Sequence, residues 1–308
     1  WKWQFFITTI LAMLASVVPV FTMGLNLGVH FVGGQMIRVT FTQSAIAPVA
    51  ELRESIDKLG YGEPIIQTFG KPNEVSIRMK LPEGSENQPE LADAMAKRIT
   101  ATIQRHHADA RIDGVDSVSG KVSGELFTTG MLALGLAMVG ISIYIWFRFE
   151  WQFGVGALFA LLQDVLLTVG MFALTQMEFD LNIVAALLTL IGYSLNDKIV
   201  VYDRIRENMK KHRRMPMHQL LDLSVNETLA RTIATSLSML ITLVALLLLG
   251  PDVIFGFTAA ITLGIFIGTY SSIFMSAPIL IWLKVNPNSF VPQETEIDRQ
   301  ERLARERG

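Results

Sequence analysis

LIGYSLNDKIVVYDRIREN, residues 190–208, begins as an apolar helix of membrane type and ends as a charged segment. An acid, Asp197, lies inside the apolar half, between Asn196 and Lys198. A carboxylate at the centre of a membrane helix costs about 2.5–3.5 kcal/mol on insertion scales, so it is seldom present without a function. The residues that could surround Asp197 and pair with it are therefore the first to identify.

The composition is that of a membrane protein with soluble parts. Of 308 residues, 51% are hydrophobic and 18% are charged, and the mean hydropathy is +0.40. These values are too apolar for an ordinary soluble protein. The formal net charge of -2 gives no reason to expect a nucleic acid partner. Because the chain has no cysteine, disulfides, thiolate catalysis and cysteine metal sites are excluded.

Six apolar runs are long enough to span a bilayer core, which takes about 20 residues in a helix. They cover residues 5–23, 126–147, 153–174, 181–202, 229–249 and 253–283. Pro278 is expected to kink or end the last run. The first run exceeds the about 7–15 apolar residues of a cleaved signal peptide, so we expect a retained membrane helix. Because the chain starts at Trp1 rather than Met, further sequence is expected to precede it.

The distribution of basic residues predicts the topology. The segment between the fourth and fifth runs is rich in Lys and Arg, whereas residues 175–180 and 250–252 contain neither. Basic segments stay in the cytoplasm, so both termini are predicted to be cytoplasmic. The expected units are a first membrane helix at 1–24, an external (periplasmic) domain at 25–123, five further membrane helices at 124–285 with a cytoplasmic loop at 203–227, and a polar cytoplasmic tail at 286–308.

The external segment predicts a small α+β domain. The spacing of apolar residues indicates strands at 36–41, 64–69, 75–81 and 110–119, and helices at 46–59 and 91–103. This βαββαβ order is that of a ferredoxin-like domain. Gly33 and Gly34, before the first strand, indicate a tight turn just outside the first membrane helix.

Arg231 is the predicted partner of Asp197. If Asp203 marks the cytoplasmic boundary, Asp197 lies about 9 Å inward at a rise of about 1.5 Å per residue. The fifth membrane helix begins near Thr228, so Arg231 lies about 4.5 Å inward, and its long side chain can reach further. The two charges fall at overlapping depths on consecutive antiparallel helices, and we predict an ion pair between them.

Hydroxyl residues extend this site along the fifth helix. Thr235, Ser238 and Thr242 follow Arg231 at i+4, i+7 and i+11, on the same helical face. Such a stripe inside a bundle could carry water and protons. Alternatively, small hydroxyl residues only let helices pack closely. An acid and an arginine on the same stripe favour the proton-carrying role.

Two further charged residues lie in membrane helices. Asp164, in the middle of the third helix beside Gln163, is either a second relay acid or a structural hydrogen-bond acceptor. Lys198 lies about 100° around the helix from Asp197. We expect Lys198 to extend towards the cytoplasm and give it no specific role.

The charged end of the opening stretch holds four residues at the expected membrane surface: Asp203, Arg204, Arg206 and Glu207. Such clusters usually fix topology through local ion pairs. A docking or helix-positioning role is the less favoured alternative. On the last apolar run, Gly264 and Gly268 form a G-x-x-x-G pattern that predicts close helix packing.

Enzyme motifs are absent from the sequence, which has no P-loop, no H-E-x-x-H and no G-x-S-x-G. An intramembrane aspartyl protease would need two facing carboxylates, and the glycine context of its second acid is missing around Asp197. We therefore expect no catalytic site, no metal and no cofactor, with protons as the coupling ion.

The sequence resembles the SecD/SecF family of bacterial protein-export membrane proteins, and within it the SecF branch. The resemblance rests on GYSLNDKIVVYDRIREN at 192–208, TLARTIATS at 228–236 and QDVLLT at 163–168. It also rests on the order of one span, a small external domain and five spans. It implies the fold of the RND superfamily, in which such a chain supplies six helices of a twelve-helix core and SecD supplies the other six.

The resemblance also implies a function and partners. A SecF-like subunit acts with SecD, alongside the SecYEG translocon and accessory membrane subunits, in the lipids of the bacterial inner membrane. It uses the proton motive force to pull or release an unfolded polypeptide after ATP-driven insertion. Asp197 and Arg231 match the family's intramembrane charged residues tied to proton coupling. Protonation of Asp197 from outside is expected to weaken its pairing with Arg231 and let the helices shift.

Two positions depart from the family pattern. HFVGG at residues 30–34 stands where the family usually has D-F-x-G-G, so the role of that acid is in doubt although both glycines remain. Gln163 stands where the family often has His, which removes a titratable group and argues against a relay through this residue. Two other functions stay open: an RND-type exporter half for lipids or drugs, and a structural translocon subunit without proton coupling.

Overall fold

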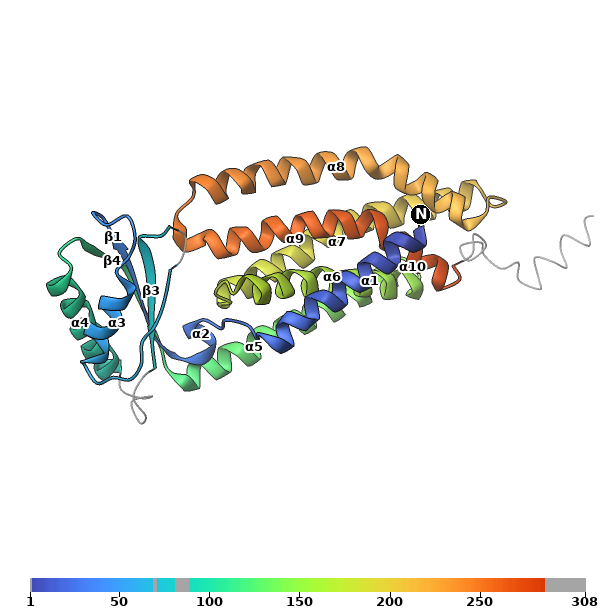
Figure 1. The fold of residues 1–308 in the computed structure, drawn as a ribbon. Coiled ribbons are helices and arrows are strands. Elements are labelled where there is room, and N and C mark those ends of the chain that lie inside the picture. Colours follow the sequence, from blue (N-terminus) through green and yellow to red (C-terminus); the bar gives the residue numbers. More distant parts are fainter. Residues whose placement is uncertain (1, 69–70, 81–88, 286–308) are drawn as a thin grey trace, which may run out of the picture.

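The computed structural model describes residues 2–68, 71–80 and 89–285 (Figure 1). A small domain that contains a β-sheet lies at one end, and a helix bundle forms the rest. The predicted tail at 286–308 lies outside the described residues, as do the last residues of the predicted strands 64–69 and 75–81.

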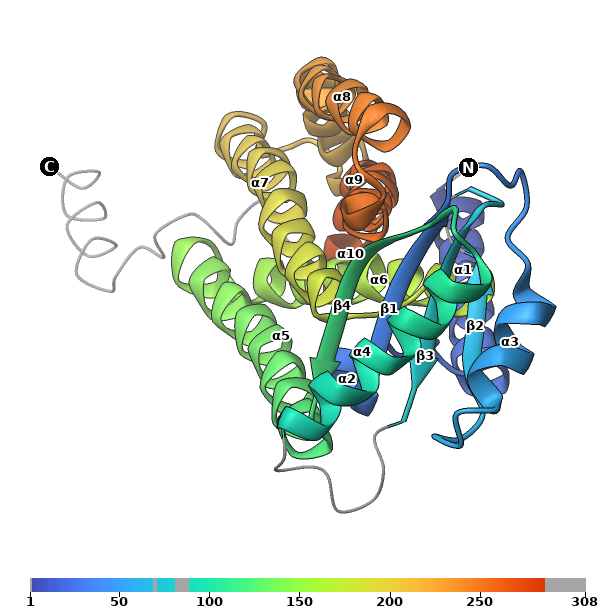
Figure 2. The same ribbon diagram turned by 90° about the vertical axis from the view of Figure 1, so that its left-hand side faces the viewer.

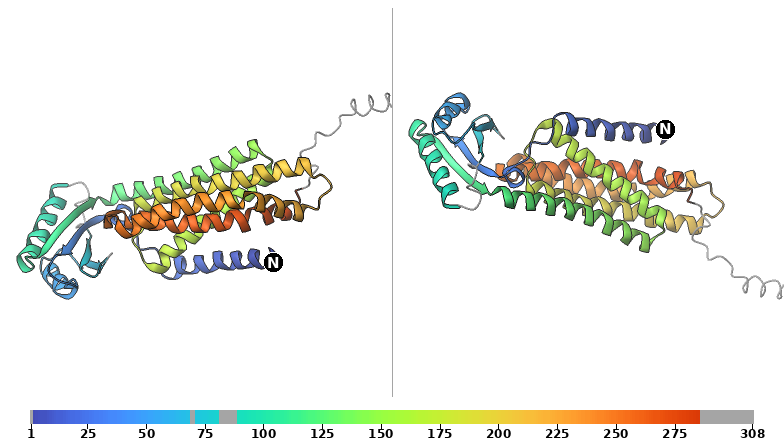
Figure 3. Two further views of the ribbon diagram at one scale, coloured as in Figure 1. Left: turned by 90° about the horizontal axis from the view of Figure 1, so that it is seen from above. Right: turned by 90° about the horizontal axis from the view of Figure 1, so that it is seen from below.

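Five of the described helices are long and apolar enough to cross a membrane. They correspond to the last five predicted spans, with bounds α5 (Gly120–Arg148), α6 (Trp151–Thr175), α7 (Leu181–Lys211), α8 (Met217–Leu249) and α9 (Phe255–Phe274). α1 (Lys2–Thr22) lies along the flank of the bundle (Figure 3), where Gly170 of α6 leaves room for Ser16. Its apolar part, Ile10–Thr22, is shorter than the other five, so the sixth span stays a prediction.

The last predicted run, 253–283, is interrupted. A short turn, η1 (Asp252–Ile254), leads into α9, and α10 (Ser276–Trp282) follows a break at Met275. Pro278 explains the break, because it has no N–H for the carbonyl of Phe274 and its ring collides with that carbonyl. The predicted interruption is confirmed, and α9 ends one turn before the proline.

The predicted cytoplasmic loop at 203–227 is mostly helical. α7 continues to Lys211 and α8 begins at Met217, so only residues 212–216 form a turn. Ion pairs one turn apart stabilise the polar end of α7, where Glu207 lies 2.6 Å from Arg204 Nη1 and 2.6 Å from Lys211 Nζ. The predicted loop was wrong because hydropathy marks where the bilayer ends and not where a helix ends.

The external domain has the predicted order of elements, βαββαβ. Its bounds are β1 (Gly34–Phe41), α3 (Val49–Asp57), β2 (Ile65–Thr68), β3 (Glu74–Met79), α4 (Pro89–His106) and β4 (Ala110–Val118). All neighbouring strands are antiparallel, in the order β2-β3-β1-β4. α3 and α4 cover the face of the sheet turned away from the bundle (Figure 2). Their buried residues Leu52, Ile56 and Ile99 pack with Ile37 and Ile77 of the sheet.

The first external helix is shorter than the predicted 46–59. It starts at Val49, directly after Pro48, and Ile46 is 73% exposed. The residue before a proline is disfavoured in the helical conformation, so the helix does not extend back through Ala47. A one-turn helix that was not predicted, α2 (Val29–Val32), precedes β1 and contains His30.

Gly33 and Gly34 form the sharp turn between α2 and β1. Their φ angles are 77° and 120°, a region that residues with a side chain rarely adopt. A β-carbon on Gly34 would also collide with the carbonyl oxygen of Met79 on the neighbouring strand. The backbone at this turn therefore requires glycine.

Gly34→Ala is expected to lower the free energy of unfolding of the external domain by about 2–5 kcal/mol, from backbone strain plus overpacking. Gly60→Ala is the matched control, because Gly60 has φ 73° but no atom within 4 Å of an added β-carbon. Hydrogen exchange of the β1 and β3 amides in both variants measures the difference. Equal effects of the two substitutions would contradict the role of the Met79 carbonyl.

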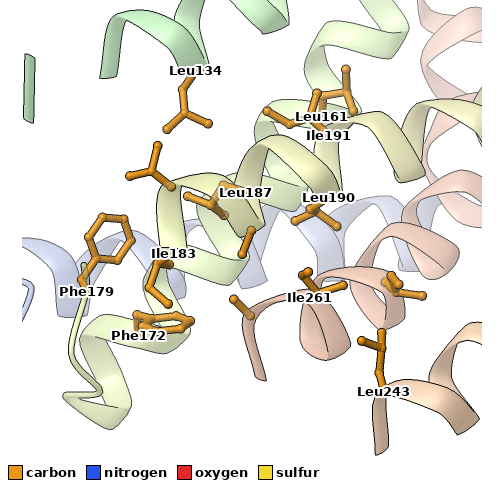
Figure 4. Close-up of a cluster of buried hydrophobic side chains, with 14 of the residues drawn as sticks. Leu134, Leu161, Phe172, Phe179, Ile183, Leu187, Leu190, Ile191, Leu243 and Ile261 are labelled. Atoms are coloured by element: carbon orange, nitrogen blue, oxygen red, sulfur yellow. The ribbon is translucent and has the colours of Figure 1, made fainter. Parts of the chain in front are cut away.

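Two apolar clusters fill the bundle, one towards each end. The cluster nearer the external domain includes Phe172, Phe179, Ile183, Leu187 and Leu190 (Figure 4). The cluster at the far end includes Phe149, Phe153, Tyr202, Ile205 and Met209. On α7, the buried members of the first cluster end at Ile191 and those of the second begin at Val201. The polar residues of the opening stretch lie between them.

Candidate functional site

A buried ion pair between Lys198 of α7 and Asp164 of α6 lies in this polar layer. Lys198 Nζ is 2.8 Å from Asp164 Oδ2, and the two side chains are 0% and 1% exposed. Lys198 also donates to the hydroxyls of Ser194 and, at 3.2 Å, Ser271 of α9. Ser194 in turn donates to Asp164 Oδ2 at 2.6 Å. The prediction that Lys198 extends towards the cytoplasm without a role is therefore wrong.

Helix geometry and glycine packing explain the position of Lys198. Each residue turns about 100° around the axis, so Lys198 faces α6 and α9 while Asp197 faces α8. Gly268 lets α9 approach closely, because an added β-carbon would lie 2.9 Å from Ser194 Oγ. A β-carbon on Gly264 would lie 2.6 Å from Leu190 side-chain atoms. The close packing predicted from the G-x-x-x-G pattern is confirmed.

Asp197 is 4% exposed and has a weak hydroxyl partner. Ser236 Oγ of α8 donates to Asp197 Oδ2 at 3.4 Å, which is long for an O–H···O hydrogen bond. Thr269 Oγ1 of α9 donates to Ser236 Oγ at 2.7 Å. The carboxylate therefore lies at the end of a short chain of hydroxyls that joins α7, α8 and α9.

The predicted ion pair between Asp197 and Arg231 is not observed. Arg231 is exposed, and no ion pair of 4.0 Å or less joins these two described residues. The charges of Lys198 and Arg231 act on Asp197 over a longer distance, that of Lys198 more strongly. Matched depth along two helices was not enough, because the side chain of Arg231 lies on an exposed part of α8.

The hydroxyl stripe of α8 that packs inward is a different one from the stripe predicted. Thr235 and Ser238 are exposed, like Arg231. The buried polar residues of α8 are Ser224, Thr228, Thr232 and Ser236. The two stripes differ by one residue, or about 100°. Both have the spacing of a helical face, so only the packing of α8 on α7 and α9 shows which one is buried.

Unpaired polar atoms lie beside the ion pair. Gln163 is fully buried, and neither atom of its side-chain amide has a hydrogen-bond partner among the described residues. The second carboxylate oxygen of Asp164, Oδ1, is likewise unpaired within the described part of the chain. Buried atoms of this kind cost about 1–3 kcal/mol each, which marks this position as functional or as strained.

The four residues predicted at the cytoplasmic face, Asp203, Arg204, Arg206 and Glu207, connect α7 to its neighbours. Arg204 Nε lies 2.7 Å from Glu227 of α8, and Asp203 lies 3.4 Å from Arg148 of α5. Burial raises the pKa of Glu150, between α5 and α6, and the charge of Arg206 opposes that rise. The predicted local ion pairs are confirmed for Arg204 and Glu207, whereas Asp203 pairs with a residue of another helix; a docking role stays a prediction.

A second polar cluster joins the domain predicted to be external to the nearby ends of the bundle helices. Arg78 of β3 lies 3.5 Å from Glu178 in the α6–α7 loop and donates to the Leu27 carbonyl at 2.6 Å. The Gly28 amide donates to the Phe179 carbonyl at 2.9 Å. Burial raises the pKa of Glu178, and Arg78 opposes that rise. Sequence reasoning missed this cluster, because its members are separated by about a hundred residues in the chain.

The raised pKa of Glu178 predicts that this junction is less stable at neutral than at acid pH. The folded state holds the proton more tightly than the unfolded chain, so the stabilisation is complete below the ordinary pKa of 4.5 and is lost as the pH rises through the raised pKa. Glu178→Gln cannot ionise and should remove this loss. Thermal midpoints of both proteins between about pH 4.5 and about pH 7.5 provide the test. Parallel curves of thermal midpoint against pH for the wild type and Glu178→Gln would contradict this prediction.

Comparison with known families identifies the chain. The family description "Protein export membrane protein SecD/SecF, C-terminal" matches residues 98–286, which include the whole polar layer. The chain belongs to the SecD/SecF family. The matched region also contains the cytoplasmic-face residues, whereas Gly33 and Gly34 lie outside it.

Relatives named "Protein translocase subunit SecF" cover nearly the whole chain, so the resemblance to the SecF branch of the family is confirmed. The protein of Cereibacter sphaeroides is 42% identical over 281 residues, which are 90% of this chain and 86% of the relative. That of Rhodobacter capsulatus is 41% identical over 297 residues, 94% and 89% of the two chains. That of Pseudomonas aeruginosa is 37% identical over 293 residues, 94% and 92%.

Solved structures of the family have the same arrangement of elements. The crystal structure of SecDF, a translocon-associated membrane protein from Thermus thermophilus, aligns with 90% of this chain at a TM-score of 0.79 and 32% identity. A SecDF structure in a super-membrane-facing form aligns with the full chain at 0.61 and 31% identity. This chain spans 37% and 39% of those two chains. The protein is a mostly helical, multi-pass membrane protein of this family.

Residues 2–68, 71–80 and 89–285 contain no group of three or more His, Asp or Glu residues that could hold a metal ion. The independence from cofactors expected from the sequence stays a prediction.

Proposed function

We propose that this chain is a SecF-type subunit that acts with SecD to promote polypeptide translocation or release after ATP-driven insertion, driven by the proton motive force. The observation that carries the proposal is the buried acid Asp197, which lies between two apolar clusters in the middle of a membrane-type bundle. The membership of the SecD/SecF family and the relatives named translocase subunits support it. Protons, and no other cofactor, are the coupling ion.

The proposed mechanism starts at Asp197. A proton that enters from outside neutralises the carboxylate and removes its attraction to the charges of Lys198 and Arg231. α7 and α8 then shift relative to each other. One charge that crosses 100 mV provides about 2.3 kcal/mol, so more than one proton is enough to bias two conformations strongly. The outer end of α7 follows directly on Glu178, whose contact with Arg78 transmits the shift to the external domain.

The proposed architecture is six membrane helices, half of a twelve-helix RND-type core, with a ferredoxin-like domain between the first two. The observed strand order and the antiparallel pairing support the ferredoxin-like assignment. The basic turn at 210–214 lies at the end of the bundle opposite the sheet (Figure 1). With this turn in the cytoplasm of a bacterium, the sheet domain is periplasmic and both termini are cytoplasmic.

The exposed stripe of α8 supports SecD as the partner. Arg231, Thr235 and Ser238 are exposed in this chain, and a charged residue facing lipid is costly. The neighbouring exposed face of α8 is apolar and includes Ile241, which is 62% exposed. We therefore propose that the polar stripe faces SecD and the apolar face contacts lipid. The translocon SecYEG, its accessory membrane subunits and the exported polypeptide are the further partners of the complex.

Single-cysteine cross-linking tests the partner assignment, and the absence of native cysteine makes the chain suitable. Ser238→Cys, in complex with SecD in native membranes, is expected to form a specific cross-link to SecD. Ile241→Cys on the apolar face is the matched control and should react with lipid-soluble reagents only. Cross-linking of Ile241→Cys to SecD but not of Ser238→Cys would exclude this orientation of α8.

Release of a preprotein intermediate from vesicles that contain SecYEG, SecD and this chain tests the function itself. Completion of translocation after ATP removal should depend on an imposed proton gradient and should stop when an ionophore collapses it. Preprotein release that does not depend on the gradient would favour the alternative of a structural translocon subunit without proton coupling. Gradient-driven extrusion of a lipid or a drug by the same vesicles, without effect on the preprotein, would favour the exporter alternative.

A further inference from the structure

Lys198 acts in the proposed mechanism only through its charge, and its contact with Asp164 has no role there. It is fully buried, and its ammonium group has three acceptors, one each on Asp164, Ser194 and Ser271. Three donors with three acceptors is the complete hydrogen-bonding capacity of a lysine.

The charges in the polar layer do not balance. α6 contributes one acid, Asp164, and α7 contributes Asp197 and Lys198. Among the described residues, the charged side chains of α8 (Asp222, Glu227 and Arg231) are all exposed, and α9 contributes only hydroxyls here. Tyr193 lies one turn before Asp197 and is neutral at ordinary pH. Two buried acids therefore share a single buried cation.

We propose that Asp164 is a second proton-binding site, coupled to Asp197 through Lys198. This inference deepens the proposed function and rests on it for its role in transport. With both acids ionised, the buried layer carries one uncompensated negative charge. With one proton on either acid, the layer is neutral. An unpaired buried charge is costly, so the state with one shared proton is favoured.

The geometry of Asp164 fits proton uptake. Lys198 and Ser194 both bond to Oδ2, while Oδ1 has no partner in the described part of the chain. A proton can therefore form an O–H bond at Oδ1 without displacing an existing hydrogen bond. Gln163, adjacent in sequence and equally buried, has an unused amide acceptor and donor. Once Asp164 is neutral, the attraction that ties α7 to α6 is largely lost.

The position of Lys198 explains the coupling. Asp197 and Lys198 are consecutive on α7 and point about 100° apart around the helix, so they face different neighbours. Lys198 bonds to Asp164 and is the residue next to Asp197 in the chain. A proton on one acid removes the attraction between that acid and Lys198, so the charge of Lys198 then attracts the other acid more strongly. Proton uptake by Asp164 of α6 thereby changes the electrostatic environment of Asp197, which faces α8, without direct contact between the two acids.

Infrared difference spectroscopy of the complex with SecD tests the proton site directly. An acid pulse on the wild type should produce protonated-carboxyl bands, of which the Asp164 band is lost in Asp164→Asn. In Lys198→Met, Asp164 keeps its proton throughout, so the same pulse should produce no change at this band. A band of full intensity in Asp164→Asn would overturn the proposal.

The double variant Asp164→Asn with Lys198→Met separates a proton site from a structural ion pair. It removes both charges, so the complex should assemble with SecD even where a single variant does not. Gradient-driven proton uptake by reconstituted vesicles should stay at least about tenfold below wild type in this variant. Lys210→Met, an exposed lysine at the end of α7, is the matched control. Wild-type uptake by the double variant would show that the pair only holds helices together, and would overturn the proposal.

These measurements keep the two proposals apart. If the wild-type complex shows the Asp164 band but no gradient-dependent preprotein release, the proton site stands and the proposed function fails. If release depends on the gradient and the band does not depend on Asp164, the proposed function stands and this inference fails.

Discussion

Asp197→Asn is expected to abolish gradient-dependent preprotein release, with a loss of about a hundredfold, while the complex with SecD still assembles. Asparagine has the same shape and can keep the contact with Ser236, which is 3.4 Å from the carboxylate in the wild type. What it cannot do is take up and return a proton, a step that contributes about 10²–10⁴-fold in proton-transfer chemistry. The assay is preprotein release from vesicles that contain the full complex, with and without an imposed gradient.

The control for this variant is Asp222→Asn, which removes an exposed carboxylate from the start of α8. It should release preprotein at the wild-type rate. Co-purification with SecD must be equal in both variants, since an assembly defect would also stop release. Wild-type release by an assembled Asp197→Asn complex would refute the assignment of Asp197 as the coupling acid.

Lys198→Met is expected to have the largest effect on stability, a loss of about 3–5 kcal/mol in the free energy of unfolding. The substitution leaves Asp164 buried at 1% exposure without its cation, and Ser194 and Ser271 lose a shared donor. Methionine has a similar length, so the effect of charge is separated from that of volume. Denaturant unfolding of the purified membrane protein in detergent measures the change.

Adding Asp164→Asn to Lys198→Met should recover most of that loss. Replacement of a complete buried ion pair by neutral side chains is often neutral in stability or even stabilising, whereas removal of one partner is costly. Lys210→Met, which removes an exposed lysine, should change the free energy of unfolding by less than about 0.5 kcal/mol. Equal losses in the single and the double variant would show that the loss of the cation beside Asp164 is not what destabilises the single one.

Much of the fold could be predicted from the sequence, because its signals are local. Five membrane-type helices and the βαββαβ order follow from runs and alternations of apolar residues. Pro278 marked the interruption of the last run, and Gly33 and Gly34 marked a turn that backbone geometry requires. The errors are also local: the predicted loop 203–227 is mostly helix, because ion pairs on its surface and buried apolar residues such as Ile205 and Met209 stabilise it.

The candidate site was predicted less completely. Asp197 and Asp164 were recognised as buried acids, because charge in an apolar run is visible in the sequence. Their partners were not: Arg231 is exposed, and the cation that contacts Asp164 is Lys198. Depth along a helix can be counted in residues, but the direction in which each face of α8 and α7 points depends on the helices packed against it.

By itself, the sequence determined that this is a multi-pass membrane protein with a small α+β domain, a buried acid at residue 197 and the motifs of the SecD/SecF family. Hydropathy and periodicity suffice for this, because each depends on neighbours along the chain. Only the tertiary structure decided that Lys198 pairs with Asp164, that Ser236 and not Thr235 faces Asp197, and that Arg78 meets Glu178. These contacts join residues far apart in the chain, and rotation of a helix by one residue would exchange one set for another.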